Sequence, residues 1–390
     1  MTHNKFLIIA ILVFITTGGL SFYFNNVSYL KKNNTTANNK ITNITEKVVN
    51  IVTKNRVVEK NNKIEEIKLT ENIVKKPENV AAVSNSLVED TKKFIFDKKE
   101  SVISKDLFVN QIKVLFVGDI MMGRSIRYKA ETVGYDFYFS CVTPTFQKYD
   151  FVVANFESTV TNYPSVSFDK TRADYNNFKF TVEPVALTAL KNSGINVVGV
   201  DNNHIYDYGK EGVDLTRQNI LASGLNYFGD PIDPNYANVR LEKNGVAFNL
   251  VSFNEFFGSV DKTLKNIAKA KGTGDLQNVA TFNHEPTIIF AHWGDEYVPT
   301  PTRVKNWAHL FIDNGADLII GMHPHVTQET ETYQNKFIAY SLGNFLFDQY
   351  FSSEVQKGGA VEIILNKEGI VSTRFLNVSL DEQRRPCIKE

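Results

Sequence analysis

The chain has 390 residues, 43 of them basic and 43 acidic, and 43% are apolar, which is enough for a sizeable core. Two cysteines, Cys141 and Cys387, are too few and too far apart for a disulfide framework or a thiolate metal site. They allow a single bridge, which no spacing pattern supports. Lys and Arg outnumber Asp and Glu in the early polar stretch, so the remainder of this neutral chain is net acidic, which argues against a nucleic-acid binder.

The chain begins with an apolar segment. Residues 6–24 are uncharged and close to the roughly 20 residues that a membrane-spanning helix needs. No Ala-x-Ala cleavage pattern follows them, so we predict an uncleaved, single-pass transmembrane helix within an anchor of residues 1–25. Lys5 on one side faces Lys31 and Lys32 on the other, so flanking charge does not determine the orientation of this anchor.

Residues 26–108 have the composition of a flexible linker. They are rich in Asn, Lys, Thr, Glu and Val, and nearly lack Gly, Pro and aromatic residues. The basic excess could attract anionic lipid headgroups, although a solvated tether is the commoner outcome of such a composition.

Residues 109–390 alternate between strand and helix patterns, which predicts an α/β domain. Apolar runs rich in Val, Ile and Phe predict strands at 112–117, 151–156, 195–200, 246–253, 287–291, 317–320, 337–341 and 360–365. Periodic segments that end at Gly predict helices at 184–193, 210–223 and 302–314. Polar motifs follow six of the strands, and we expect their carboxyl ends to meet in one crevice at the edge of a single sheet.

These polar motifs contain the residue types of a metal site. Only seven histidines occur in the chain, yet four lie in such motifs, and two carboxylates close apolar runs. Imidazole and carboxylate together suit Zn, Mn or Fe, and we predict one or two divalent ions, with Mn or Zn favoured. The predicted ligands are Asp119, Glu157, Asn203, His292, His323 and His325.

Two of these histidines are separated by a single proline. Pro324 biases His323 toward extended geometry, and residues i and i+2 of an extended chain project from the same side. We therefore expect His323 and His325 to reach one centre. His309, off the apolar stripe of its helix, and His284, in a polar loop, are assigned to no site.

His204 directly follows a predicted ligand. It is placed to act as a general acid that protonates a leaving group, and Asp207, three residues on, is a candidate orienting partner.

The motif series of the domain resembles that of the CapA family of bacterial capsule and poly-gamma-glutamate biosynthesis proteins. The matching motifs, in order, are Gly118-Asp119-Ile120-Met121-Met122-Gly123-Arg124, Asn155-Phe156-Glu157, Asn202-Asn203-His204, Ala291-His292-Trp293-Gly294-Asp295-Glu296-Tyr297, Gly321-Met322-His323-Pro324-His325 and Ser341-Leu342-Gly343-Asn344. The resemblance implies a calcineurin-like metallophosphoesterase fold, a sandwich of mixed sheets flanked by helices. It also implies an extracytoplasmic domain on a cell-membrane anchor, with capsule-synthesis membrane proteins as partners.

Two positions depart from ordinary calcineurin-like phosphoesterases. Met121 stands where a histidine ligand is usual, and Glu157 stands where a bridging aspartate is usual. A complete two-metal centre is therefore an open question. Arg124, Ser341 and Asn344 are candidate substrate-binding residues, although Arg124 is equally suited to a surface or capping role and Asn344 to a turn.

Three functions fit these features. The first is a factor that assembles or exports an anionic polymer, poly-gamma-glutamate. The second is a metal-dependent phosphoesterase that acts on an extracytoplasmic phosphate ester. The third is a non-catalytic scaffold on the same fold, which the Met121 departure motivates.

Overall fold

The computed structural model describes residues 11–16, 19–24, 110–165, 168–169, 172–173, 178–272 and 285–389. The chain divides into two compact units, Met1–Val102 and Ile103–Glu390. The predicted linker, residues 26–108, lies outside the described residues.

The first unit does not confirm the predicted transmembrane helix. Its described residues are two antiparallel strands, β1 (Ile11–Thr16) and β2 (Gly19–Phe24). The segment is rich in β-branched and aromatic residues, and an apolar run of this kind has the same pattern whether it forms a strand or a buried helix. Among the described residues, no helix is both long enough and apolar enough to cross a bilayer.

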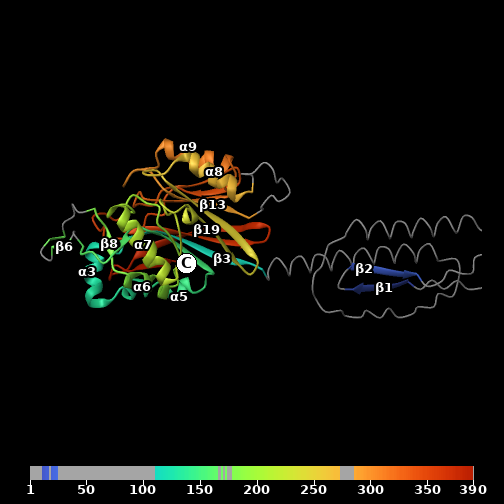
Figure 1. Ribbon diagram of the computed structural model, residues 1–390, viewed down its shortest axis with the longest axis horizontal. Coiled ribbons are helices and arrows are strands. Elements are labelled where there is room, and N and C mark those ends of the chain that lie inside the picture. Colours follow the sequence, from blue (N-terminus) through green and yellow to red (C-terminus); the bar gives the residue numbers. More distant parts are fainter. Residues whose placement is uncertain are drawn as a thin grey trace, which may run out of the picture. The chain divides into compact units, whose positions relative to one another are not determined.

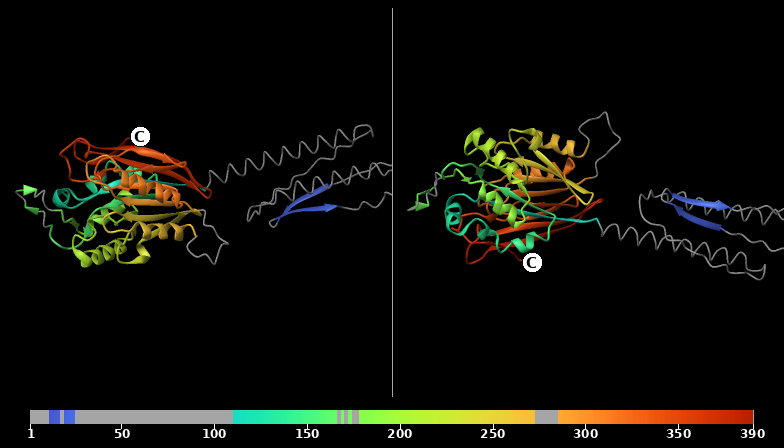
Figure 2. Two further views of the ribbon diagram at one scale, coloured as in Figure 1. Left: turned by 90° about the horizontal axis from the view of Figure 1, so that it is seen from above. Right: turned by 60° about the horizontal axis from the view of Figure 1, so that its bottom comes forward.

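The second unit contains a mixed sheet of eight strands built around β3. Its order is β10-β9-β4-β3-β18-β19-β20, and β17 also pairs with β3. The strands are β3 (Ile112–Ile120), β4 (Phe151–Phe156), β9 (Val197–Gly199), β10 (Asn226–Phe228), β17 (Asn344–Leu346), β18 (Lys357–Asn366), β19 (Gly369–Leu380) and β20 (Pro386–Lys389). Figure 2 shows the C-terminal strands, in red, beside β3.

A second sheet of six strands has the order β11-β12-β13-β14-β16-β15. Its strands are β11 (Asn238–Lys243), β12 (Val246–Asn254), β13 (Thr287–His292), β14 (Leu318–Met322), β15 (Thr330–Tyr333) and β16 (Lys336–Ala339). Two short pairs lie outside both sheets, β5 (Thr159–Val160) with β8 (Thr181–Val182), and β6 (Phe168–Asp169) with β7 (Arg172–Ala173).

The two sheets pack face to face, and helices cover their outer faces (Figure 1). Alternate residues of β3 show this arrangement, because Val114 and Phe116 join the core between the sheets while Leu115 and Val117 join the core beneath the helices. The first sheet is covered by α3 (Arg124–Val133), α4 (Asp136–Phe139), α5 (Thr143–Phe146), α6 (Val185–Ser193) and α7 (Gly209–Ser223). The second sheet is covered by α8 (Val260–Ala270) and α9 (Thr302–Asp313).

The predicted α/β class is confirmed, and a strand forms in each of the eight predicted runs. The predicted helices correspond to α6, α7 and α9. The expectation of a single sheet is wrong, because β3, β4 and β9 belong to the first sheet whereas β13, β14 and β16 belong to the second. Strands buried on both faces read as the same continuous apolar runs, so their sequences do not indicate which sheet each one joins.

Cys141 and Cys387 form a disulfide, with 5.4 Å between their Cα atoms. Cys141 lies between α4 and α5, and Cys387 lies in the edge strand β20. The bridge therefore links the C-terminal strand to the helical layer across a sequence separation of 246 residues. No spacing pattern in the sequence had supported it.

Candidate metal centre

Asp119 lies near the carboxyl end of β3, fully buried. Its backbone N–H donates to Gly343 O at 2.9 Å, and Asn344 of β17 is its register partner. A Cβ atom at Gly118 would lie 2.0 Å from Gly343 O, so only glycine permits this approach of the two backbones. The close packing brings the loop after β16 against the predicted ligand.

Asn155 connects the two acidic ligands. Its Nδ2 lies 2.7 Å from Asp119 Oδ1 and 3.5 Å from Glu157 Oε2, and it also lies 3.3 Å from His292 Nδ1. Asn155 is not among the predicted site residues. The signal for it was its place two residues before Glu157, since residues i and i+2 near the end of a strand share one side.

Glu157 is a buried carboxylate without full compensation. Its side chain is fully buried, and Oε1 has no hydrogen-bond partner. His204 Nε2 lies 3.7 Å and His325 Nε2 3.9 Å from this oxygen, both too far for a hydrogen bond. Burial, and then the neighbouring carboxylate of Asp119, raise the pKa of Glu157 well above its ordinary value. A bound cation would supply the missing compensation.

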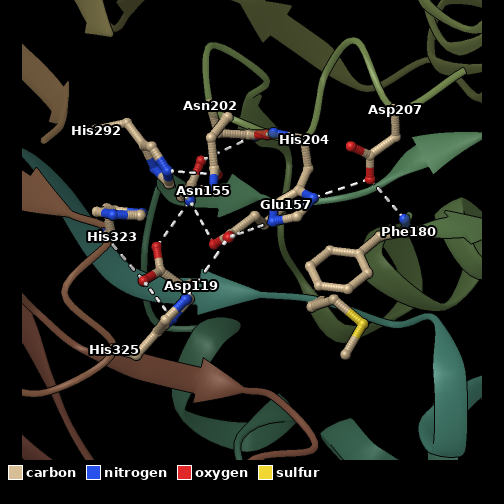
Figure 3. Close-up of polar contacts among 12 residues, drawn as sticks. Asp119, Asn155, Glu157, Phe180, Asn202, His204, Asp207, His292, His323 and His325 are labelled. Carbon is tan, nitrogen blue, oxygen red and sulfur yellow. Dashed lines mark hydrogen bonds and ion pairs between the residues drawn. The ribbon is translucent and has the colours of Figure 1, made fainter. Parts of the chain in front are cut away.

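Three imidazoles face these carboxylates (Figure 3). His292 ends β13, and its ring centroid lies 4.7 Å from that of His323, which follows β14. Burial lowers the pKa of His292 well below its ordinary value, and nearby His323 adds to the effect. Burial, and then His325, lower the pKa of His323 to about 3. Both rings are therefore neutral near pH 7, which is the form that binds metal.

The backbone of the His323-Pro324-His325 loop is not extended. His323 has a φ of 98° and His325 a φ of 60°, so the prediction of extended geometry is wrong. Both imidazoles nevertheless reach the site, with ring centroids 5.7 Å apart. The loop is held by its backbone, because His323 N–H donates to Asp119 Oδ2 at 3.1 Å and Pro324 O accepts from Tyr297 N–H at 2.9 Å. Such strained residues concentrate at functional sites.

Asn344 orients the ring of His325. The amide Nδ2 of Asn344 donates to Gln349 Oε1 at 3.0 Å and to Val355 O at 3.1 Å, which identifies Oδ1 as the acceptor. Oδ1 lies 3.0 Å from His325 Nδ1, so this nitrogen carries the proton. The other nitrogen, Nε2, is then free to bind a metal ion beside Glu157.

Among the described residues, three groups of side chains have ligand atoms within 4.8 Å of one another. They are Asp119 with Glu157 and His325, Glu157 with His292 and His323, and Glu296 with His323 and His325. Asn203, the remaining predicted ligand, lies beside them, with Oδ1 2.9 Å from His292 Nε2. The structure therefore brings all six predicted ligands together. Their mixture of imidazole and carboxylate, with Glu157 Oε1 and His323 Nδ1 buried and lacking hydrogen bonds, fits a divalent ion.

His204 and Asp207 form the predicted pair. His204 Nδ1 lies 2.9 Å from Asp207 Oδ2, and Asp207 also accepts the N–H of Phe180 at 2.6 Å. The ring of Phe180 stacks on the imidazole at 3.9 Å. These contacts direct His204 Nε2 toward Glu157. The general-acid role of His204 stays a prediction.

The predicted substrate-binding residues have protein partners of their own. The guanidinium of Arg124 forms an ion pair with Asp348 and lies 4.7 Å from the ring centroid of Phe180. Ser341 Oγ accepts the N–H of Gly343 at 3.0 Å, and Asn344 orients His325. Their contacts with a substrate stay predictions.

Met121, the departure in the first motif, packs among aromatic side chains. It forms a small buried cluster with Phe180 and Phe347. Its sulfur accepts the N–H of Gly123 at 3.0 Å.

Comparison with known proteins identifies the family. Residues 113–349 match the family model described as "Bacterial capsule synthesis protein PGA_cap". The chain belongs to this family. The family predicted from the motifs is thereby confirmed, and the matched residues contain every predicted ligand.

Two proteins from Bacillus species are similar to this chain. "Capsule biosynthesis protein CapA" of Bacillus anthracis is 34% identical over 61% of this chain and 60% of its own length. "PGA biosynthesis protein CapA" of Bacillus subtilis (strain 168) is 31% identical over 70% of this chain and 73% of its own length. Among solved structures, the NAD nucleotidase of Haemophilus influenzae covers 72% of this chain and 60% of its own at 11% identity, with a TM-score of 0.35.

Proposed function

We propose that this protein takes part in the assembly or export of a poly-gamma-glutamate capsule, as a membrane-anchored extracytoplasmic factor with a metal-dependent, hydrolase-like site. Membership of the capsule synthesis family supports the process, and the printed names of the two bacillus relatives support the polymer. The observation that carries the chemistry is the buried group of Asp119, Glu157 and His325, in which Glu157 Oε1 has no hydrogen-bond partner. A metallophosphoesterase-like sandwich is part of this proposal.

Each side chain of the site has a distinct task in this proposal. Asp119, Glu157, Asn203 and the three histidines hold one or two ions, Mn or Zn by their chemistry. A divalent ion held there would make a water molecule more acidic and would stabilise the negative charge that develops on the oxygens of an attacked phosphoryl or carbonyl group. His204, whose Nδ1 is oriented by the Asp207 carboxylate, would donate a proton from Nε2 to the leaving group when the ring is protonated on both nitrogens.

The disulfide supports an extracytoplasmic location. Disulfides persist in oxidising compartments and are rare in the cytosol, and Cys141 and Cys387 form one here. Residues 6–24 would then serve as the membrane anchor. This location is tested by blocking free thiols in whole cells with an alkylating reagent and then counting the alkylated cysteines of the denatured protein. Alkylation of both cysteines would contradict the proposed location.

Metal content and surface polymer together test the proposed function. Elemental analysis of the purified full chain should detect Mn or Zn, and the double variant Asp119→Ala, His325→Ala should contain neither. In a strain that lacks its own copy of the gene, the wild-type chain should restore cell-surface poly-gamma-glutamate and the double variant should not. His309→Gln, which changes a histidine on α9 outside the site, is the matched control. Full restoration by the double variant would refute a role for the metal site.

A second candidate, a metal-dependent phosphoesterase, is favoured by the His204–Asp207 pair beside the ligands. Hydrolysis of any member of a phosphoester panel with Mn or Zn, abolished by His323→Ala, would support it. The same result would dismiss a non-catalytic scaffold, the alternative that the packed thioether of Met121 favours.

A further inference from the structure

Glu296 has no assigned role in the site as described, yet it is part of the third ligand group. Its carboxylate lies within 4.8 Å of ligand atoms of His323 and His325. Both imidazoles are buried, at 3% and 2% exposure, whereas Glu296 is exposed. This side chain therefore approaches the two rings from the solvent side.

The loop that carries Glu296 is held on both sides of it. Gly294, at a φ of 90°, donates its N–H to Glu255 Oε2 at 2.7 Å. Tyr297, at a φ of 64°, donates its N–H to Pro324 O at 2.9 Å, which ties the loop to the histidine loop. Asp295, the neighbouring carboxylate, is instead bound to Arg303 at 2.7 and 2.9 Å. Of these two adjacent acids, only Glu296 belongs to a ligand group.

The membership of the three groups suggests how Glu296 acts. Two of the groups are fully buried and are called the inner groups here. One contains Asp119 and His325, the other contains His292 and His323, and Glu157 belongs to both. The group of Glu296 takes one histidine from each inner group. Two neighbouring ions, each held by one inner group, would therefore have Glu157 between them in the interior and Glu296 across them at the surface.

Met121 gives a reason for such a ligand. The thioether accepts the N–H of Gly123 and packs against aromatic rings, so the first motif supplies only Asp119 as a predicted metal ligand. The inner group of Asp119, Glu157 and His325 then has three ligands. A carboxylate has two oxygens and can bind two ions at once, so one exposed glutamate could add a ligand to both positions.

We propose that Glu296 is a direct metal ligand that bridges two ion positions from the solvent side and exchanges with an anionic group of the substrate. The proposal rests on the metal site of the proposed function. Glu296 is exposed, whereas Glu157 is buried. An exposed carboxylate that leaves the ions is solvated by water, so it avoids the free-energy cost of an unpaired buried charge.

Titration of the chelator-stripped full chain with Mn²⁺, followed by calorimetry and elemental analysis, tests this proposal. The wild-type protein should bind two ions. Glu296→Gln should bind both ions more weakly than the wild type, one of them by at least about tenfold, as loss of a ligand contact at each position requires. Glu296→His, which restores a ligand atom, should recover much of the lost affinity. Asp295→Asn is the matched control and should bind both ions as the wild type does.

The outcomes separate this proposal from the proposed function. Two ions of unchanged affinity in Glu296→Gln would overturn the bridging role and leave the metal site intact. A single ion in both the wild type and Glu296→Gln, at equal affinity, would also overturn it. No ion in the wild type would instead remove the metal site itself, and the bridging role with it.

Discussion

The pKa of His323 makes the stability of the metal-free protein depend on pH. Burial, and then His325, lower this pKa from 6.5 to about 3, so the folded protein keeps the ring neutral where the unfolded chain binds a proton. The contribution of His323 to stability is therefore complete above the unfolded pKa and is lost as the pH falls through 6.5 toward about 3.

The size of the effect follows from the pKa difference. One pKa unit corresponds to about 1.4 kcal/mol, so acidification from about pH 6.5 to about pH 5 removes about 2 kcal/mol through His323 alone. The assay is urea unfolding of the full chain in chelator at about pH 7.5 and about pH 5. Replacement of His323 with Gln removes the titrating group, so the loss of unfolding free energy on acidification should shrink by about 2 kcal/mol.

His309→Gln is the control for this experiment. This ring is partly exposed on α9, where it lies 3.0 Å from Glu331 and outside the metal site. The control should not show the smaller loss of unfolding free energy on acidification that is expected of His323→Gln. An equal loss on acidification in the wild type and His323→Gln would refute the reasoning, because it would mean that the buried ring titrates as it does in the unfolded chain.

Three further perturbations test other parts of the structure. Glu157→Gln should raise the melting temperature of the metal-free protein at neutral pH and abolish metal binding, since burial raises the pKa of this carboxyl; a lower melting temperature would contradict this. Cys141→Ser should lower the unfolding free energy by about 2–5 kcal/mol in non-reducing urea titrations, and an unchanged midpoint would argue against the bridge to Cys387. Gly118→Ala places a Cβ 2.0 Å from Gly343 O and should cost about 1–3 kcal/mol in the same titration, with weaker metal binding; wild-type behaviour would refute the close approach.

Local sequence signals were sufficient for the elements that are buried on both faces. Strands β3, β4, β13 and β14 are continuous apolar runs, and such runs are distinctive even in a single sequence. The strands that the sequence analysis missed include β11, β15 and β19, whose residues are largely exposed or half-buried. Exposed strands carry few apolar residues in a row, so their periodicity resembles that of a polar loop.

The ligand set followed from the positions of polar residues after apolar runs. Asp119, Glu157, His292, His323 and His325 were each named in this way, and the structure brings them together. Asn155 and Glu296 were not named, because an Asn inside a strand and a Glu in a polar loop are ordinary by themselves. Only their distances to the other ligands distinguish them.

The sequence by itself determined the family, the α/β class and the residue types of the metal centre, because motifs and hydrophobic runs are local properties of the chain. The tertiary structure decided that two stacked sheets rather than one converge on the site. It also decided that His323 and His325 reach the site through left-handed backbone, and that Cys141 pairs with Cys387. Each of these features depends on contacts between segments far apart in the chain, and local sequence patterns do not predict such contacts.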